Sequence, residues 1–408
     1  MTDTHYDIIV FGATSFVGQI VCRYLSSEYN DPDLRWAAAG RSESKLRSLQ
    51  QVLGTNDSSM PILLADADDP NSLQALCQRC DVIISTVGPY ALFGEPMVKA
   101  CVETGTDYCD LTGETQWIQR MVERYQAQAE QSGARIVHCC GFDSIPSDLG
   151  VYFLQEQTRD RYGEFCSAVK MRVKAMRGGF SGGTVASLIN VIKEASKDPA
   201  LRKSLANPYS ICPPDFQPSV RQHNINGAEF DGEFNSWIAP FVMSAINTRV
   251  VHRSNALAGA VYGEHFRYDE AVITGAGIKG RLAAMAMTAG LGGLMIGGAL
   301  APSRWLLERF ILPKPGEGPS PEAQLSGFYD LRFSGELTNG QQVRCKVTGD
   351  RDPGYGSTAK MLSQAAICLQ GIDRKTRGGG IWTPATAMGR PLIERLEKPA
   401  GLTFQMAQ

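Results

Sequence analysis

The first third of the chain alternates between two spacings of apolar residues. Short apolar runs rich in Val, Ile and Ala are separated by segments in which apolar residues return every three or four positions, as in helices packed on one side. Strands alternating with helices predict a parallel sheet covered on both faces, whose ligands bind at the carboxyl ends of the strands. The expected strands are residues 6–10, 34–41, 60–66, 81–90 and 134–143, with another short strand ending at Asp110.

The second part of the chain has a different texture. It holds longer strand-like segments, a glycine-rich loop at 178–184 before a helix, an irregular stretch at 207–232 and a linker at 312–322. The tripeptide Thr338-Asn339-Gly340 between two such segments predicts a hairpin. These features indicate an α+β domain with a mixed, largely antiparallel sheet. Its expected strands are residues 165–176, 245–254, 265–274, 327–337 and 341–350.

The expected fold class is therefore α/β, in three consecutive parts. A Rossmann-type parallel-sheet domain should cover residues 1–150, and the α+β domain, for substrate binding or dimerisation, residues 151–350. Residues 351–408 should contain a helix at 356–369 that returns to the first domain.

The turn after the first strand carries the sequence GATSFVG. Gly12 permits a tight turn and Gly18 close packing of the helix on the sheet, so that the free N–H groups of the helix start can face a pyrophosphate. Ser15 stands where the full fingerprint has a middle glycine, and its hydroxyl could itself donate to a phosphate oxygen. The alternative is a plain tight strand–helix turn. The expected cofactor-binding residues here are Gly12, Thr14, Ser15, Phe16, Val17 and Gly18.

The end of the second strand indicates which dinucleotide the turn would bind. An NAD site usually places Asp or Glu there, whereas this strand ends in Gly40, Arg41 and Ser42, with Lys45 one helical turn further. A guanidinium suits a ribose 2′-phosphate, so Arg41, Ser42 and Lys45 predict NADP(H). The alternative for Arg41 is a solvated side chain at a helix start.

Other strand ends supply candidate catalytic residues. Thr86, Val87 and Gly88 should lie beside the nicotinamide half of the cofactor, and Tyr90 is either a proton donor or a packed aromatic residue at a turn. Glu114 follows the strand that ends at Asp110, and either carboxylate could hold the ribose or the substrate, although Asp110 could instead cap the next helix.

Asp143 closes the next strand of the sheet. It should line the site and is the third catalytic candidate, after Tyr90 and Glu114, with Ser144 and Ser147 beyond it at a helix start. No metal site is expected, because Cys77-x-x-Cys80 precedes a strand and has no second pair at a ligand spacing.

An uncharged stretch from Leu282 to Ser303 interrupts this ordinary picture, within an apolar helical insert at 279–312. Its length nearly satisfies a membrane span, but it is rich in glycine and lacks a strongly apolar centre. Three alternatives remain open: a surface hairpin or acyl-chain wall that contacts a lipid surface through 282–312, a buried layer at a dimer or domain contact, and a true span.

Composition narrows the class of protein. The chain has 408 residues, 43% of them hydrophobic, and a formal net charge of −2 without a long basic run, which argues against nucleic-acid binding. Eleven cysteines without disulfide-like spacing indicate a reducing compartment, and the first residues do not form a signal peptide. We expect a cytoplasmic protein that could attach peripherally to the inner face of the plasma membrane.

Nine segments taken together, in order, carry a family resemblance: GATSFVG, AAAGR, STVGPY, YCDLTGE, CGFDSIPSDLG, SGGTVAS, LPKPGEGPS, GDRDPGYGSTAKML and WTPATAMG. With them the chain resembles the saccharopine dehydrogenase-like oxidoreductases, trans-acting enoyl reductase branch, over nearly its whole length. The resemblance implies an NADP-type nucleotide domain, a second domain and a final helix that returns to the first. It also implies a link to lipid or glycolipid synthesis, or to lipid droplets and membranes.

These observations predict an NADPH-dependent oxidoreductase that reduces a C=C or C=O bond of a hydrophobic acyl-type substrate, in a chain that could form a homodimer. One alternative is a saccharopine-type C=N reductase acting on an amino acid, which needs clustered arginines. Another is a non-catalytic nucleotide-binding protein of a lipid surface. The arginine candidates for the C=N reductase are Arg172, Arg177, Arg249 and Arg253.

Overall fold

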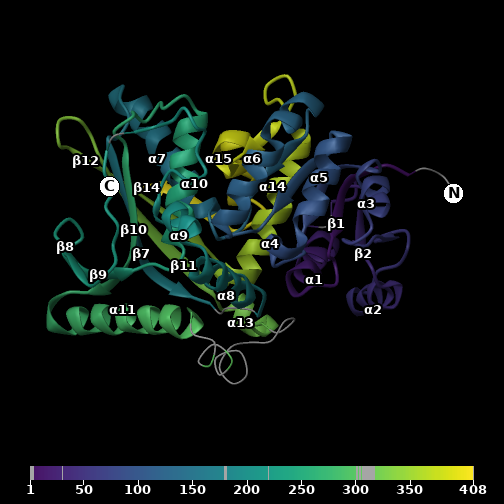
Figure 1. Cartoon of the computed structure of the whole chain (residues 1–408), viewed down its shortest axis with the longest axis horizontal. Helices are drawn as coiled ribbons and strands as arrows, with labels where there is room; N and C mark the ends of the chain where they lie inside the picture. The colour runs from purple at the N-terminus through teal and green to yellow at the C-terminus, as the bar shows by residue number, and fades with distance from the viewer. Residues whose placement is uncertain are drawn as a thin grey trace.

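Two seven-stranded sheets lie beside one another in the computed structural model, with the nucleotide-type sheet on the right of Figure 1 and the second sheet on the left. The structure describes residues 4–29, 31–178, 182–218, 220–299, 302, 305 and 318–407. The expected glycine-rich loop at 178–184, the end of the apolar insert and the linker at 312–322 therefore fall partly or largely outside the described residues.

The first sheet is parallel throughout, in the order β13-β6-β5-β4-β1-β2-β3. Successive side chains of its strands enter two different cores, as period-two alternation requires: Ile8 and Val10 face one, Ile9 and Phe11 the other. The strands are β1 (Tyr6–Phe11), β2 (Trp36–Gly40), β3 (Ile62–Leu64), β4 (Cys80–Ser85), β5 (Asp107–Asp110), β6 (Arg135–Val137) and β13 (Gly380–Trp382).

Helices cover both faces of this sheet, which confirms the doubly covered parallel architecture. One face packs against α1 (Phe16–Arg23), α2 (Glu43–Leu53) and α14 (Thr358–Gly371). The other packs against α3 (Pro70–Cys77), α5 (Glu95–Thr104) and α6 (Thr115–Ser132). Two short elements complete this half, the π-helix η1 (Tyr24–Tyr29) and α4 (Tyr90–Phe93).

The second sheet is mixed and largely antiparallel, in the order β14-β12-β11-β7-β10-β9-β8. Only the pair β7 and β10 is parallel, and β11 and β12 form the expected hairpin around Asn339-Gly340. The strands are β7 (Ala168–Arg177), β8 (Glu229–Asp231), β9 (Ser236–Pro240), β10 (Arg267–Gly275), β11 (Phe328–Glu336), β12 (Gln342–Gly349) and β14 (Leu402–Met406).

Helices α7 and α10 join the two halves, because α7 leaves the first sheet at β6 and packs on β12 and β11, while α10 packs on α7 and β10. These two helices are α7 (Ile145–Tyr162) and α10 (Ser244–Leu257). The other described helices of the second half and of the C-terminal segment are α8 (Gly182–Lys197), α9 (Pro199–Ala206), α11 (Gly277–Ala299), α13 (Pro321–Leu325), η2 (Pro353–Ser357), α15 (Pro384–Ala387) and α16 (Gly389–Glu397).

One predicted strand is wrong. Residues 245–254 form most of the helix α10, not a strand. Its apolar residues Ile246, Val250 and Val251 are buried, but so are the polar residues Asn247 and His252. A helix buried all round shows no amphipathic period, and its β-branched residues imitate a strand in the sequence.

The C-terminal segment divides between the two sheets. As expected, α14 packs on β1, β4 and β5, but β13 extends the first sheet and β14 extends the second. The expectation that all of 351–408 packs on the nucleotide domain is therefore wrong for β14. Its pairing with β12 is set by contacts distant in sequence, which local patterns do not encode.

The uncharged stretch is helical over its part up to Ala299, within a continuous helix that begins at Gly277, and the remainder falls largely outside the described residues. Figure 1 places it along the lower edge of the second sheet, at the periphery of the molecule. It is the one helix in the described part of the chain that is long and apolar enough to cross a membrane, judged by length and composition, and 11% of its apolar window is buried. Among the described residues α11 is therefore not buried at a domain contact, and burial at a dimer contact stays a prediction.

Candidate functional site

The turn after β1 has the geometry of a phosphate-binding loop. Gly12 adopts φ +84°, and a Cβ there would lie 2.7 Å from Cγ2 of Val87 and 2.8 Å from Oγ1 of Thr86. A Cβ on Gly18 would overlap the carbonyl oxygen of Gly12. Both glycines are therefore required, one for the turn and one for the close approach of α1.

Ser15 serves the loop itself. Its Oγ accepts a hydrogen bond from the N–H of Gly18 at 2.9 Å, which caps α1, and lies 2.9 Å from Oγ1 of Thr86. Thr86 in turn donates to the carbonyl of Gly12 at 2.9 Å. The Ser15 hydroxyl thus ties the loop to the end of β4, which accounts for a serine at this position without a direct phosphate contact.

The backbone at the start of α1 fits a pyrophosphate. The N–H groups of Thr14, Phe16 and Val17 have no acceptor within the described part of the chain. They precede or open the first helical turn, where the helix dipole favours negative charge. Three unpaired donors beside a glycine turn form a suitable anion cradle.

The end of β2 provides cations without competing acids. Arg41 and Lys45 are exposed, and neither forms an ion pair with a described carboxylate. Ser42 caps α2 by accepting a hydrogen bond from the N–H of Lys45. This edge of the sheet therefore suits a 2′-phosphate and lacks the carboxylate that would bond a free 2′-hydroxyl.

The C-terminal segment packs against the same loop. The ring of Phe16 makes an edge contact with Tyr355 of η2, with centroids 5.1 Å apart. The Oγ1 of Thr358 accepts a hydrogen bond from the N–H of Phe142 at 3.0 Å. The Phe16 side chain thus packs against the C-terminal segment, while its backbone N–H stays available to a phosphate.

Tyr90 is a packed residue in this structure. It is buried, its ring stacks on Trp117 at 5.3 Å, and its hydroxyl donates to the carbonyl of Ser85 at 2.9 Å. Burial raises its pKa well above the usual value. Of the two interpretations of Tyr90, the geometry favours the packed aromatic over the proton donor.

Glu114 connects three elements. Its carboxylate accepts hydrogen bonds from the N–H groups of Tyr90 at 2.8 Å and Ala91 at 3.0 Å, and from the Ser187 hydroxyl at 2.9 Å. Burial raises the pKa of Glu114, and these donors oppose the rise. These three bonds connect Glu114 to α4 and α8 and favour a structural role over proton exchange.

Asp110 holds a histidine that sequence reasoning missed. Its Oδ2 lies 2.7 Å from Nδ1 of His138, and its Oδ1 accepts from the N–H groups of Thr112 and Cys139. His138 is buried, so this pair fixes the turn after β5 against the end of β6. Its position at a strand end was the signal that could have found it.

Asp143 differs from the other carboxylates of the site. Its carboxylate accepts no side-chain or backbone hydrogen bond from another described residue. Burial, followed by the nearby charge of Asp110, raises its pKa to about 7. A Cβ built on Gly113 would lie 3.8 Å from Oδ1 of Asp143 and from Cε of Met243. Asp143 therefore differs from Asp110 and Glu114, whose carboxylates are held by several described donors.

A buried polar network connects this region to the second sheet. Asn247 of α10 accepts a hydrogen bond from Ser144 at 3.1 Å and donates to Ser147 at 3.1 Å and to Glu270 at 2.9 Å. Tyr268 donates to Glu270 at 2.6 Å, and burial raises the pKa of Glu270 to about 7. Sequence reasoning missed Asn247 and Glu270, because only the fold brings them beside Ser144.

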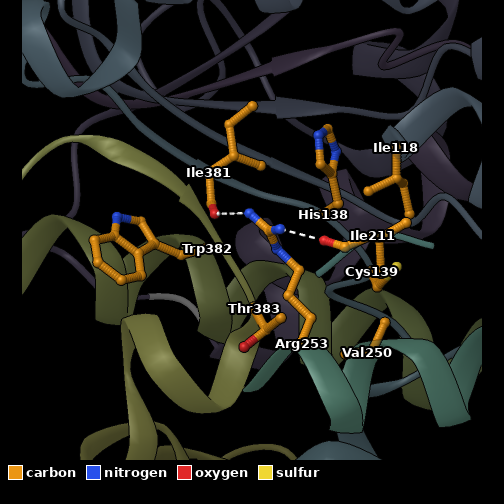
Figure 2. A pocket seen from close by; sticks show the side chains of 9 residues that line it. All are labelled: Ile118, His138, Cys139, Ile211, Val250, Arg253, Ile381, Trp382 and Thr383. Atoms are coloured by element: carbon orange, nitrogen blue, oxygen red, sulfur yellow. Dashed lines mark hydrogen bonds between the residues drawn. The ribbon is translucent and has the colours of Figure 1, made fainter. Parts of the chain in front are cut away.

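A small pocket borders α10, which contributes Val250 and Arg253 to its lining (Figure 2). Its volume of about 10 Å³ corresponds to roughly one water molecule. Arg253 spans it and donates to the carbonyl oxygens of Ile211 and Ile381. Burial lowers the pKa of Arg253 to about 10. Arg253 thus links α10 to β13 and to the segment around Ile211.

The other candidate arginines do not converge on a ligand. Arg172 is buried in ion pairs with Asp231 and Asp269, Arg249 donates to backbone carbonyls, and Arg177 is exposed at the end of β7. No cluster of three His, Cys, Asp or Glu suited to a metal ion occurs among the described residues. The described site therefore consists of the dinucleotide loop, the cationic edge of β2 and the Asp143 region.

A dinucleotide loop on a parallel sheet, joined to a second mixed sheet, defines an NADP-dependent oxidoreductase with a saccharopine dehydrogenase-like fold. Residues 8–137 match the family model described as the saccharopine dehydrogenase NADP binding domain. A saccharopine dehydrogenase (L-Glu forming) structure from Saccharomyces cerevisiae superposes with a TM-score of 0.54 at 12% identity, covering 99% of this chain and 100% of that one.

Sequence comparison gives the particular family. The chain is 39% identical over 415 residues to a protein of Mycobacterium tuberculosis named as a trans-acting enoyl reductase, covering 99% of this chain and 98% of that one. It is 37% identical over 410 residues to the trans-acting enoyl reductase of Mycobacterium bovis, covering 97% and 96%. The chain belongs to the trans-acting enoyl reductase family.

Proposed function

We propose that this oxidoreductase reduces the C=C bond of an enoyl substrate carried on a hydrophobic acyl chain, and that Asp143 supplies the proton. The observation that carries the proposal is the position of Asp143 at the carboxyl end of the first sheet, where its carboxylate accepts no hydrogen bond from another described residue; burial raises its pKa to about 7, which suits this role. The names of the relatives support the enoyl substrate. Leu92 and Phe93, exposed on α4, offer apolar surface for the acyl chain.

The chain's own residues divide the work as follows. Thr14, Phe16 and Val17 would offer N–H groups to the pyrophosphate, and Arg41 would bind the 2′-phosphate. When bound, the reduced nicotinamide supplies a hydride to the β carbon of the enoyl group. Asp143 gives its proton to the α carbon and regains it from water, so that the C=C bond becomes CH–CH and NADPH becomes NADP⁺.

The saccharopine-type alternative receives no support from the arginines. A substrate with several carboxylates needs converging cations, and Arg172, Arg249 and Arg253 are occupied by carboxylates or backbone carbonyls. An enoyl substrate carries fewer charges than a saccharopine-type substrate, so it does not need these arginines as partners.

The test follows the loss of NADPH absorbance with trans-2-enoyl thioesters of increasing chain length. When the reaction is run in D₂O, the product should carry one deuterium at the α carbon. Asp143→Asn should lower kcat by about a hundredfold or more, the usual contribution of a general acid, without weakening NADPH binding. Because Asp143 acts protonated, kcat should fall as pH rises through about 7, and the variant should lose this dependence.

Asp148→Asn is the matched control, because burial also raises the pKa of Asp148 to about 7 but its carboxylate is held by Ser254 and Ala385. Unchanged kcat and pH dependence in Asp143→Asn would refute the role of Asp143. Reduction of an α-keto acid with an amino acid, without any enoyl turnover, would establish the saccharopine-type reaction instead.

A further inference from the structure

Helix α11 exposes its large apolar side chains and buries small ones, the reverse of an ordinary surface helix. Its buried positions are the small residues Gly280, Ala284 and Gly298, which let it lie close to the sheet edge and α8. Its large apolar side chains point outward: Met285 is 50% exposed and Ile296 is 66% exposed. A helix of a soluble protein normally buries its large apolar side chains, so this exposed apolar face is suited to contact another molecule.

The charges beside this face are positive. Helix α11 contains no acidic residue, and Lys279 and Arg281 near its start form no ion pair with a described carboxylate. Arg281 lies instead over the ring of Trp237, 5.3 Å from its centroid. An apolar face bordered by cations and an aromatic ring has the composition of segments that lie in a membrane interface.

The neighbouring acids pair with other basic side chains and not with Lys279 or Arg281. In the β8–β9 hairpin, which α11 contacts, Asp231 pairs with Arg172, Glu233 with Lys170 and Glu229 with His223. None of these carboxylates forms an ion pair with Lys279 or Arg281, but Asp231 shares Arg172 with Asp269 and His223 is charged only when protonated, so the local acids are only partly neutralised. Phe230 of the same hairpin is exposed and packs edge-on against Trp237.

We propose that α11 and the rim formed by Phe230, Trp237, Lys279 and Arg281 bind the surface of an anionic lipid bilayer. The helix lies in the plane of the interface, with Met285 and Ile296 in the acyl region and the cations at the headgroups. This surface is independent of the enoyl reaction. Helix α8 relates it to the site, since Ser187 bonds Glu114 and Ile192 lies against Gly298.

The test uses the full chain in vesicle flotation. Vesicles of equal parts phosphatidylcholine and phosphatidylglycerol should carry the protein upward, and vesicles of phosphatidylcholine alone should carry much less. Lys279→Gln should weaken binding to the anionic vesicles about fivefold, the effect of one surface charge. The double variant Met285→Glu with Ile296→Glu should weaken it by at least about tenfold, because both side chains enter the acyl region.

Val52→Glu is the matched control, because Val52 is 72% exposed on α2 of the nucleotide domain. It should float like the unmodified chain, and all variants should retain NADPH binding, which verifies the fold. Failure of the unmodified chain to float, or flotation of the double variant at the unmodified level, would overturn the proposal. A dimer in light scattering that the double variant dissociates, without vesicle binding, would show that a second copy covers α11 instead.

Discussion

We expect Arg41 to determine the cofactor preference at the edge of β2. Replacing it with Ala removes a charge-assisted contact worth about 1.5–3 kcal/mol, so NADPH affinity should fall between about tenfold and a hundredfold. NADH affinity should not change, since NADH lacks the 2′-phosphate. Titration of the fluorescence of each reduced nucleotide measures both affinities.

Arg47 is the control for this experiment, because it lies on the same helix and its guanidinium is engaged by Asp57 and Glu43. Arg47→Ala should leave the preference for NADPH intact. An equal loss of affinity for the two nucleotides in Arg41→Ala would contradict the assignment of the 2′-phosphate to Arg41.

Single residues show where sequence reasoning stops. Arg41 was found from its place after the second strand, because a strand end fixes which edge of the sheet a residue occupies. The same logic found Tyr90 and Asp143 but not the directions of their side chains. Tyr90 turns inward to the carbonyl of Ser85, while the Asp143 carboxyl remains unengaged. His138 was missed because its partner Asp110 lies on another strand.

At the scale of elements, Glu114 connects α4 and α8 through hydrogen bonds. Glu114→Ala leaves two buried N–H groups and the Ser187 hydroxyl without their acceptor, which should cost about 2–4 kcal/mol of unfolding free energy. Urea unfolding monitored by circular dichroism measures this loss.

Ser187→Ala isolates the contribution of α8. A double-mutant cycle between the two positions should give a coupling energy of about 0.5–3 kcal/mol, because the residues are in direct contact. Additive effects of the two substitutions would show that Glu114 stabilises α4 alone.

The elements that sequence reasoning missed share a physical cause. Strands β8, β13 and β14 contain three to five residues each, too few to show a period, and β13 and β14 pair with strands far along the chain. The βαβ elements were found because each carries its own period and turn residues. Helix α10 was misread because its polar residues, Asn247 and Arg253 among them, are buried with the apolar ones.

For the whole molecule, three carboxyls relate stability to pH. Asp143, Asp148 and Glu270 have folded pKa values of about 7, raised chiefly by burial above the values 3.8, 3.8 and 4.5. Between those limits the folded chain binds more protons than the unfolded chain, so the free energy of unfolding falls as pH rises through about 4.5 to 7.

Thermal unfolding followed at about pH 5 and about pH 8 should therefore give a lower Tm at the higher pH. Asp148→Asn should reduce the slope, because the amide keeps an acceptor for the N–H of Ala385 and cannot ionise. Each unit of pKa shift corresponds to about 1.4 kcal/mol, an upper bound for a group that relaxes. A slope unchanged in Asp148→Asn would assign the effect to other groups.

The last strands of the chain have a consequence for its synthesis. Because β13 closes one edge of the first sheet and β14 closes one edge of the second, neither sheet has its full set of strands until residues beyond Gly380 leave the ribosome. A nascent chain therefore exposes the open backbone edges of β6 and β12 to chaperones or to other chains.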